Sequence, residues 1–209
     1  MTNMQKNPHD IFNDFKFVPG TSVLKGKLPD AIFEEVKEMV EIGKKTKDHP
    51  LAYLKHRKTN VGNVYRNTAD IAKLEQSFLM PLLTFLGEYY LNKTANIPLD
   101  NLDRKVTLRE LMGHYTKYDV WINYSYKGDS VPIHQHEATM SGNIFVQNEE
   151  EAKTIFQHIN GVYQGREVGI IGEPGEIIIF PANLPHYVPI LKEDKERITM
   201  TFNLNKSES

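Results

Sequence analysis

The spacing of apolar residues changes partway along the chain. Up to about residue 110 they recur every three or four positions, which is the period of an amphipathic helix. From residue 114 onward they alternate with polar residues, which is the period of a half-buried strand. We therefore predict one domain over residues 1–209, mainly β with N-terminal helices, in which 1–113 form a mostly helical buttress and 114–209 form the β core.

Two long helices are predicted in the first part. Every fourth residue from Leu28 to Val40 is apolar, so a helix should begin at Pro29 and end near Asp48. A second, wider apolar stripe covers 71–89, after capping residues that precede it. The remaining predictions for this part are a loop at 92–101 and a short helix at 107–112.

The second part reads as about eight short strands separated by turn residues. In chain order they cover 120–126, the segment that holds His134 and His136, 140–147, 154–159, 168–171, 176–180, 187–191 and 197–204. Many short strands with regular turn signals favour a jelly roll or a related barrel.

Composition excludes several classes of protein. The net charge is −2 without a long basic run, so charge-driven binding of nucleic acid has no support. The chain has no cysteine, which excludes disulfides, thiolate zinc sites and cysteine nucleophiles. The first residues lack the apolar core of a signal peptide, and no stretch has the length of a membrane span. We expect a soluble cytoplasmic protein.

Three histidines stand out by their spacing. His134 and His136 are two residues apart, so on one strand both side chains would share a face. His186 follows a predicted buried strand bracketed by prolines. Three imidazoles that converge from two strands suit a transition metal, whereas the alternative is a set of ordinary strand histidines. No partner pattern surrounds His9, His49, His56, His114 and His158, for which solvated or core roles are expected.

Arg197 opens the last predicted strand. Its planar guanidinium can pair with a carboxylate through two hydrogen bonds, and Thr199 on the same face can add a third. The alternative is a surface arginine paired with an acidic residue of 193–196. A metal site beside a carboxylate clamp is the layout of an enzyme that uses 2-oxoglutarate.

The segment 121–204 resembles the double-stranded β-helix core of the Fe(II)/2-oxoglutarate-dependent oxygenases. It looks most like a bacterial and phage subgroup with a His-x-His motif. The motifs that carry the resemblance are, in order, Trp121-Ile-Asn123, Gly128, His134-Gln-His136, Ser141-Gly142, Phe180-Pro181 with His186, and Arg197-Ile-Thr199.

The resemblance implies a dioxygenase with Fe(II) as cofactor, 2-oxoglutarate as cosubstrate and O2 as oxidant. It implies hydroxylation of a substrate C–H bond with release of succinate and CO2. The implied roles are metal ligands and catalytic centre for His134, His136 and His186, and 2-oxoglutarate contacts for Arg197, Thr199, Asn123 and Asn143. A peptide, a nucleobase and a small metabolite all remain open as substrates, and the apolar helix faces permit a homodimer. Trp121 is expected to be a core residue.

One position departs from the wider superfamily, because His136 stands where most members have a carboxylate. Three neutral imidazoles would also suit other divalent metals. The adjacent Glu137 could substitute, although on a strand it would point to the opposite face. Two rival functions stay open: a cupin-type metalloenzyme without 2-oxoglutarate, and a catalytically silent metal-binding module. A cupin expects a glutamate where Met140 and Ser141 stand, and would have no use for Arg197.

Overall fold

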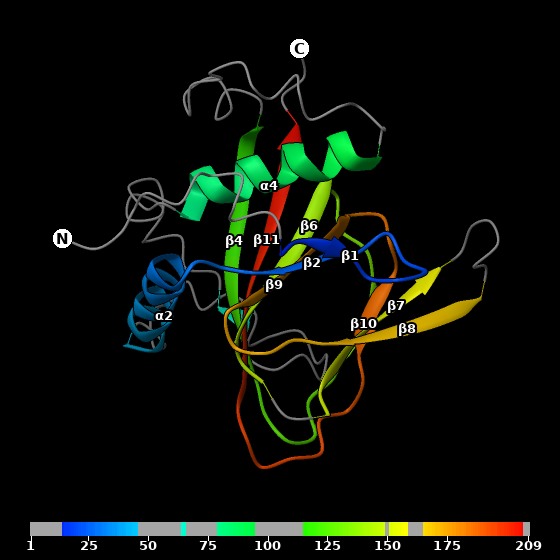
Figure 1. The fold of residues 1–209 in the computed structure, drawn as a ribbon. Helices are drawn as coiled ribbons and strands as arrows, with labels where there is room; N and C mark the ends of the chain where they lie inside the picture. The colour runs from blue at the N-terminus through cyan, green and yellow to red at the C-terminus, as the bar shows by residue number, and fades with distance from the viewer. Residues whose placement is uncertain are drawn as a thin grey trace.

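The computed structural model describes residues 14–45, 64–65, 79–94, 115–148, 151–158 and 165–206. Within these ranges the protein is mostly β, with two antiparallel sheets and two helices (Figure 1). The predicted helix at 107–112 and the first part of the predicted helix at 71–89 lie outside the described residues.

The larger sheet has the strand order β1-β2-β9-β6-β11-β4-β3. Its strands are β1 (Lys16–Phe17), β2 (Leu24–Lys27), β3 (Val64–Tyr65), β4 (Tyr115–Ser125), β6 (Met140–Gln147), β9 (Glu176–Pro181) and β11 (Arg197–Lys206). Residues 1–113 were predicted to be mostly helical, yet they supply three of these strands. The N-terminal part therefore extends the sheet as well as covering it.

The smaller sheet has the strand order β5-β10-β7-β8. Its strands are β5 (Val131–His134), β7 (Lys153–His158), β8 (Arg166–Ile171) and β10 (His186–Val188). From β4 to β11 the chain crosses repeatedly between the two sheets, so residues far apart in sequence meet in the space between them. β10 is shorter than predicted: it covers His186–Val188 instead of 187–191.

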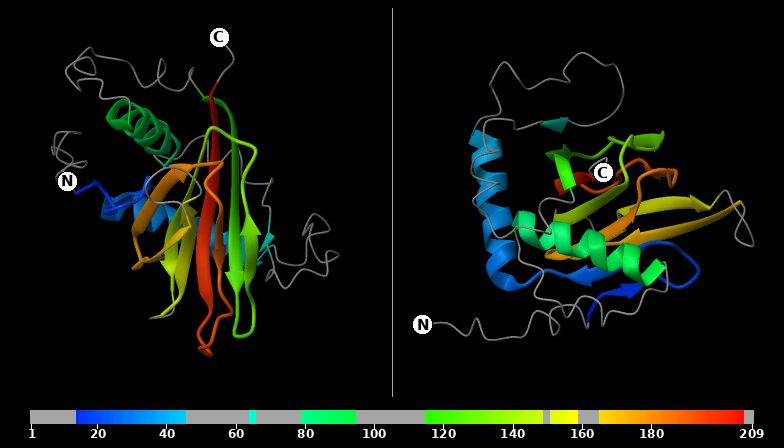
Figure 2. Two further views of the ribbon diagram at one scale, coloured as in Figure 1. Left: turned by 90° about the vertical axis from the view of Figure 1, so that its right-hand side faces the viewer. Right: turned by 90° about the horizontal axis from the view of Figure 1, so that it is seen from above.

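The helices α2 (Asp30–Lys45) and α4 (Leu79–Thr94) pack on one face of the larger sheet. α2 agrees with the predicted first helix. α4 continues through 92–94, so the predicted loop cannot begin at residue 92. In the view from above, α2 lies on one side of the molecule and β7 and β8 on the other (Figure 2). Neither helix is long and apolar enough to cross a membrane.

Strand β11 is buried on both faces, and the two faces differ in chemistry. Ile198, Met200, Phe202 and Leu204 face the helices and join the main hydrophobic core. The alternate residues are polar and also buried, namely Arg197, Thr199, Thr201 and Asn203. On the neighbouring strand β6, Phe145 lies on the same face as this polar row, and it belongs to a core cluster with Phe156 of the smaller sheet. The polar row therefore lies between the two sheets.

Candidate functional site

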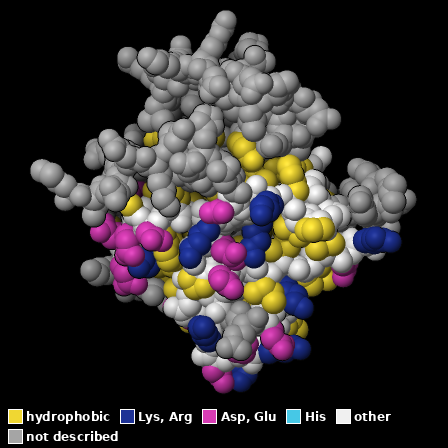
Figure 3. All heavy atoms as spheres, in the orientation of Figure 1, with side chains coloured by type: hydrophobic (Ala, Val, Ile, Leu, Met, Phe, Trp, Pro, Cys, Tyr) yellow, Lys and Arg dark blue, Asp and Glu magenta, His cyan; other side chains and the backbone are white. Residues whose placement is uncertain are grey.

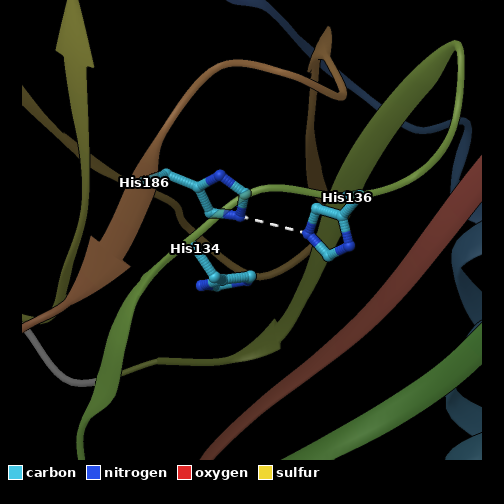
Figure 4. A group of neighbouring side chains, drawn as sticks. All are labelled: His134, His136 and His186. Carbon is cyan, nitrogen blue, oxygen red and sulfur yellow. Dashed lines mark hydrogen bonds between the residues drawn. The ribbon is translucent and has the colours of Figure 1, made fainter.

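The three histidines come together between the sheets (Figure 4). Their ligand-type nitrogen atoms all lie within 4.8 Å of one another. His134 ends β5 and His186 begins β10, and the two residues are register partners in the smaller sheet. His186 is buried, whereas His134 and His136 are half-buried. Two of the three side chains are therefore partly exposed.

His136 does not lie on the strand of His134, so the prediction of one shared strand face was wrong. β5 ends at His134, and its continuation would run opposite Pro185. Proline has no N–H to give to a ladder, so pairing stops there. The backbone N–H of His136 donates instead to the carbonyl of Ala182 at 2.9 Å. His136 therefore reaches the cluster from the connection between β5 and β6.

Two backbone carbonyls fix the tautomers of His134 and His186. Nδ1 of His134 lies 2.8 Å from the Pro132 carbonyl, and Nδ1 of His186 lies 2.9 Å from the Leu184 carbonyl. A carbonyl oxygen can only accept, so each Nδ1 carries the proton and each Nε2 keeps its lone pair. A hydrogen bond from the second ring nitrogen is the usual support of a metal-binding imidazole.

Burial keeps two of the rings neutral. It lowers the pKa of His186 to about 3 and that of His136 to about 4, with a smaller contribution from positive charge on His134. A neutral imidazole is the form that binds a metal. Both rings are therefore ready to act as ligands at neutral pH without first losing a proton.

Trp121 forms a wall of the cluster, although it was expected to be an ordinary core residue. Its ring centroid lies 5.8 Å from that of His136, and its side chain is half-buried. On the other side Phe180 and Phe156 pack against the ring of His186, with centroids 4.8 and 5.6 Å away. The histidines thus stand in a largely aromatic surrounding.

Arg197 is only 3% exposed, which excludes the surface ion pair considered above. Its Nε donates to Asn148 Oδ1 at 3.1 Å, and its Nη2 donates to Thr154 Oγ1 at 3.3 Å. The guanidinium lies over the ring of Phe145, 5.9 Å from the centroid. Neither Asn148 nor Thr154 had been singled out in the sequence, because their roles depend on strands far apart in the chain.

Asn123, Thr199, Thr201 and Asn143 form one hydrogen-bonded group. Asn123 Nδ2 donates to Thr199 Oγ1 at 3.2 Å and to Thr201 Oγ1 at 2.7 Å. Thr201 in turn donates to Asn143 Oδ1 at 2.7 Å. The structure therefore brings together Asn123, Thr199 and Asn143, and adds Thr201. The only sequence signal for Thr201 was the alternation Arg-x-Thr-x-Thr, which puts it on the same face of the strand as Arg197 and Thr199.

The other candidates are not part of the cluster. Glu137 is exposed, and among the described residues the group that could hold a metal contains only the three histidines. His9, His49, His56 and His114 lie outside the described residues, and the side chain of His158 does too.

A shallow pocket of about 440 Å³ lies elsewhere, between β1, β2 and β9. It contains none of the site residues, and its Lys25 is already paired with Glu176 at 2.8 Å. On the face shown in Figure 3, Lys and Arg side chains lie next to Asp and Glu side chains. We therefore place the candidate site at the histidine cluster.

The donor set suits Fe(II). Three imidazole nitrogens bind Fe, Ni, Cu and Zn, and they leave room for further ligands on a six-coordinate ion. A buried arginine on the strand that lines the same space suits a carboxylate. The residues present therefore fit an iron ion and a dicarboxylate cosubstrate.

Comparisons with known proteins agree with this geometry. Residues 119–203 match the family described as "Putative 2OG-Fe(II) oxygenase". The fold is similar to that of a prolyl-4-hydroxylase from Pseudomonas putida, with 10% identity, a TM-score of 0.57 and coverage of 95% of this chain and 98% of that one. No curated protein sequence matches the chain.

Two further likenesses are partial. An oxidoreductase of the 2OG-Fe(II) oxygenase family from Burkholderia pseudomallei is 17% identical, with a TM-score of 0.38 over 56% of this chain and 57% of that one. A variant of oxalate decarboxylase from Bacillus subtilis is 13% identical, with a TM-score of 0.36 over 45% of this chain and 23% of that one. We draw nothing further from these two. Over residues 119–203 the chain is therefore similar to the Fe(II)- and 2-oxoglutarate-dependent oxygenases, a group of oxidoreductases that use Fe(II), 2-oxoglutarate and O2.

Proposed function

We propose that this protein is a Fe(II)- and 2-oxoglutarate-dependent hydroxylase that acts on a C–H bond of a peptide, a nucleobase or a small molecule. One observation carries the proposal. A cluster of three histidines within 4.8 Å and a buried arginine line the same interior space of a two-sheet fold. His134 and His186 would then be held by the smaller sheet, His136 by the connection between β5 and β6, and the cosubstrate clamp by the larger sheet.

We also propose that the β core is a double-stranded β-helix. From β4 to β11 the chain places β4, β6, β9 and β11 in one sheet and β5, β7, β8 and β10 in the other. All pairings in both sheets are antiparallel. This crossing between two sheets is the property of a jelly roll, and it supports the predicted core.

His134, His136 and His186 would hold the iron through their Nε2 atoms. The Pro132 and Leu184 carbonyls keep the proton on Nδ1 of His134 and His186, so their Nε2 lone pairs point toward the cluster. When bound, the iron couples the oxidative decarboxylation of 2-oxoglutarate by O2, which gives succinate and CO2, to insertion of the other oxygen atom into a substrate C–H bond.

Arg197 and Thr199 would bind the distal carboxylate of 2-oxoglutarate. Asn148 and Thr154 hold the guanidinium in place, which reduces the entropy lost when a carboxylate binds. Thr199 Oγ1 accepts from Asn123, which leaves its own O–H to be donated to the carboxylate. Asn123 and Asn143 would act mainly by orienting Thr199 and Thr201.

The aromatic side chains around the histidines would exclude water. Phe156 and Phe180 pack on His186, and Trp121 lies beside His136. A site with little water strengthens the electrostatic interactions inside it and limits side reactions.

The test is the visible charge-transfer band that appears when 2-oxoglutarate chelates Fe(II). The protein should be purified without oxygen and titrated with Fe(II) and then with 2-oxoglutarate. We expect a band in the wild type and a much weaker band in Arg197→Ala at the same 2-oxoglutarate concentration. The matched control is Arg166→Ala, since Arg166 is an exposed arginine on β8. Succinate release with candidate substrates would follow.

The alternatives give different results. A protein that binds Fe(II) but shows no band at any 2-oxoglutarate concentration would be a cupin-type enzyme or a silent metal-binding module. An unchanged band in Arg197→Ala would refute the clamp while leaving the metal site in place.

A further inference from the structure

Asn203 has a buried oxygen atom that the fold does not use. The residue is 8% exposed, and its Oδ1 accepts no hydrogen bond among the described residues. Every other buried side-chain N or O atom in the described part of the chain has a partner. A buried acceptor without a donor is destabilising, and it gains most from a ligand that supplies one.

The position of Asn203 relates this oxygen to the proposed active site. Arg197, Thr199, Thr201 and Asn203 form one row on β11, with about 7 Å between successive members. Thr201 is the register partner of Trp121, and Trp121 lies against His136. Asn203 is the register partner of Ser141, which pairs with Phe180, and the Phe180 ring lies 4.8 Å from that of His186. Along this row the histidines therefore lie at the level of Thr201 and Asn203, with Arg197 at the far end.

The two ends of this row would then have different ligands. The cosubstrate would extend from Arg197 toward the histidines, so it occupies the part of the row at Thr199. Asn203 stands at the other end of the row, level with the histidines, beside which the proposed function requires the substrate. In this respect the inference rests on that function.

The neighbours of Asn203 define the kind of group that would bind. Asp119 is its register partner on β4 and Ser141 on β6, and the Ser141 hydroxyl donates to the Phe202 carbonyl. Its hydrogen is therefore committed, and it can offer a ligand only lone pairs. The half-buried indole of Trp121 supplies a flat apolar surface nearby on the same face. Two acceptors beside an indole disfavour an anion and favour a planar group with an N–H.

We infer that Asn203 Oδ1 accepts a hydrogen bond from an amide-type N–H of the substrate, whose planar group lies against Trp121. Asn203 and Trp121 would be substrate-positioning residues at the level of the histidines, at the end of the row far from Arg197.

A pair of small amides tests this inference. N-methylacetamide is planar and has one N–H, and N,N-dimethylacetamide has the same amide plane without the N–H. Trp121 is the single tryptophan of the chain, so its fluorescence reports on this surface alone. The full-length protein should be titrated with each compound, first without metal and then with Fe(II) in the absence of oxygen. We expect a saturable change that needs about fivefold less N-methylacetamide than N,N-dimethylacetamide, the effect of one neutral hydrogen bond.

Two variants separate a ligand-binding role from a structural one. Asn203→Leu should remove the difference between the two amides and should not lower the unfolding midpoint of the ligand-free protein. Asn143→Leu is the matched control, because Asn143 Oδ1 accepts from Thr201, and its unfolding midpoint should fall. Equal binding of the two amides by the wild type would overturn the inference, and so would equal destabilisation by the two variants.

The outcome is independent of the test of the proposed function, because the amide titration needs neither 2-oxoglutarate nor turnover. A protein that shows the charge-transfer band but does not distinguish the amides would refute this inference alone. A protein that distinguishes the amides but shows no band would refute the proposed function and keep the amide site.

Discussion

Nε2 of His136 lies 3.2 Å from Nε2 of His186. The Leu184 carbonyl holds the proton of His186 on Nδ1, so His186 Nε2 can only accept at this contact. His136 Nε2 must then carry the proton when no cation is present. Binding of a metal ion there would require this proton to sit on Nδ1 of His136 instead, so that the Nε2 lone pairs of both neutral rings face the ion. The same contact therefore explains how the cluster is stable without a metal and why it is suited to bind one.

The first prediction concerns stability against pH. An ordinary histidine has a pKa of 6.5, but the folded protein has values of about 4 for His136 and about 3 for His186. Between these values and 6.5 the unfolded chain binds more protons, so acid favours unfolding. Above pH 6.5 neither histidine should make the free energy of unfolding of the metal-free protein depend on pH. This free energy should fall as the pH is lowered from there toward 3.

Urea denaturation between about pH 4 and about pH 8 measures this dependence. The matched variant is His186→Gln, which keeps a polar side chain of similar size without a titrating ring. Its free energy of unfolding should change less with pH below 6.5. An identical slope in the wild type and this variant would mean that His186 is not the source of the effect.

The second prediction concerns the ligand that departs from the usual carboxylate. His136→Ala removes one of three ligand nitrogens and should weaken Fe(II) binding by at least about 100-fold, because losing even a supporting group costs 10- to 100-fold. His136→Asp supplies an oxygen and makes the common set of two histidines and one carboxylate, so it should keep most of the affinity.

Trp121 fluorescence can follow this metal titration, because its ring centroid lies 5.8 Å from that of His136. Glu137→Ala is the control, since Glu137 is the exposed neighbouring residue and should not affect binding. Wild-type affinity in His136→Ala would show that the metal is held without His136.

Local sequence patterns predicted most of the β core. Strands β6, β7, β8, β9 and β11 lie within two residues of their predicted bounds, because alternation and turn residues are local signals. The shared face of Arg197 and Thr199 followed the same alternation, whereas their burial is shown by the structure, because β11 is buried on both faces. In contrast, β2 contains Gly26 and two lysines, and it is a strand because it pairs with β9. Such pairing between distant segments leaves no pattern in the segment itself.

The contacts of the site were less predictable than its residues. The bend that moves His136 off β5 depends on Pro185, which is almost fifty residues away and opposes the end of the strand. The partners of Arg197 are Thr154 on β7 and Asn148, the residue that follows β6. Thr201 was missed because a threonine in a strand is common, and only its bonds to Asn123 and Asn143 distinguish it.

The third prediction concerns that hydrogen-bonded group. Thr201 is 4% exposed and joins Asn123 on β4 to Asn143 on β6. Thr201→Val keeps the shape but removes the hydrogen bond to the buried Asn143 Oδ1 and one of the two that Asn123 Nδ2 donates. We expect the free energy of unfolding to fall by about 1–3 kcal/mol. Thr201→Ser keeps the hydroxyl and should cost less, so an equal loss in the two variants would assign the effect to packing instead.

The fourth prediction concerns the close packing of two neighbouring strands of the larger sheet, β6 and β11. Gly142 on β6 lies opposite Phe202 on β11, and a Cβ at Gly142 would overlap the Phe202 ring and crowd the Ile178 carbonyl. Phe202 is fully buried in the main core, so its ring has no free space to move into. Gly142→Ala should therefore lower the free energy of unfolding by at least about 1–3 kcal/mol.

Gly169→Ala on β8 is the matched control for this substitution. A Cβ at Gly169 would meet the side chain of Lys153, whose exposed and flexible end can move aside. It should change the free energy of unfolding by less than about 0.5 kcal/mol. The two variants add the same methyl group to a strand glycine, so the difference between them measures the rigidity of the Phe202 ring. If Gly142→Ala were as mild as Gly169→Ala, β11 could shift relative to β6. The fixed position of Arg197 with respect to the histidines would then need another explanation.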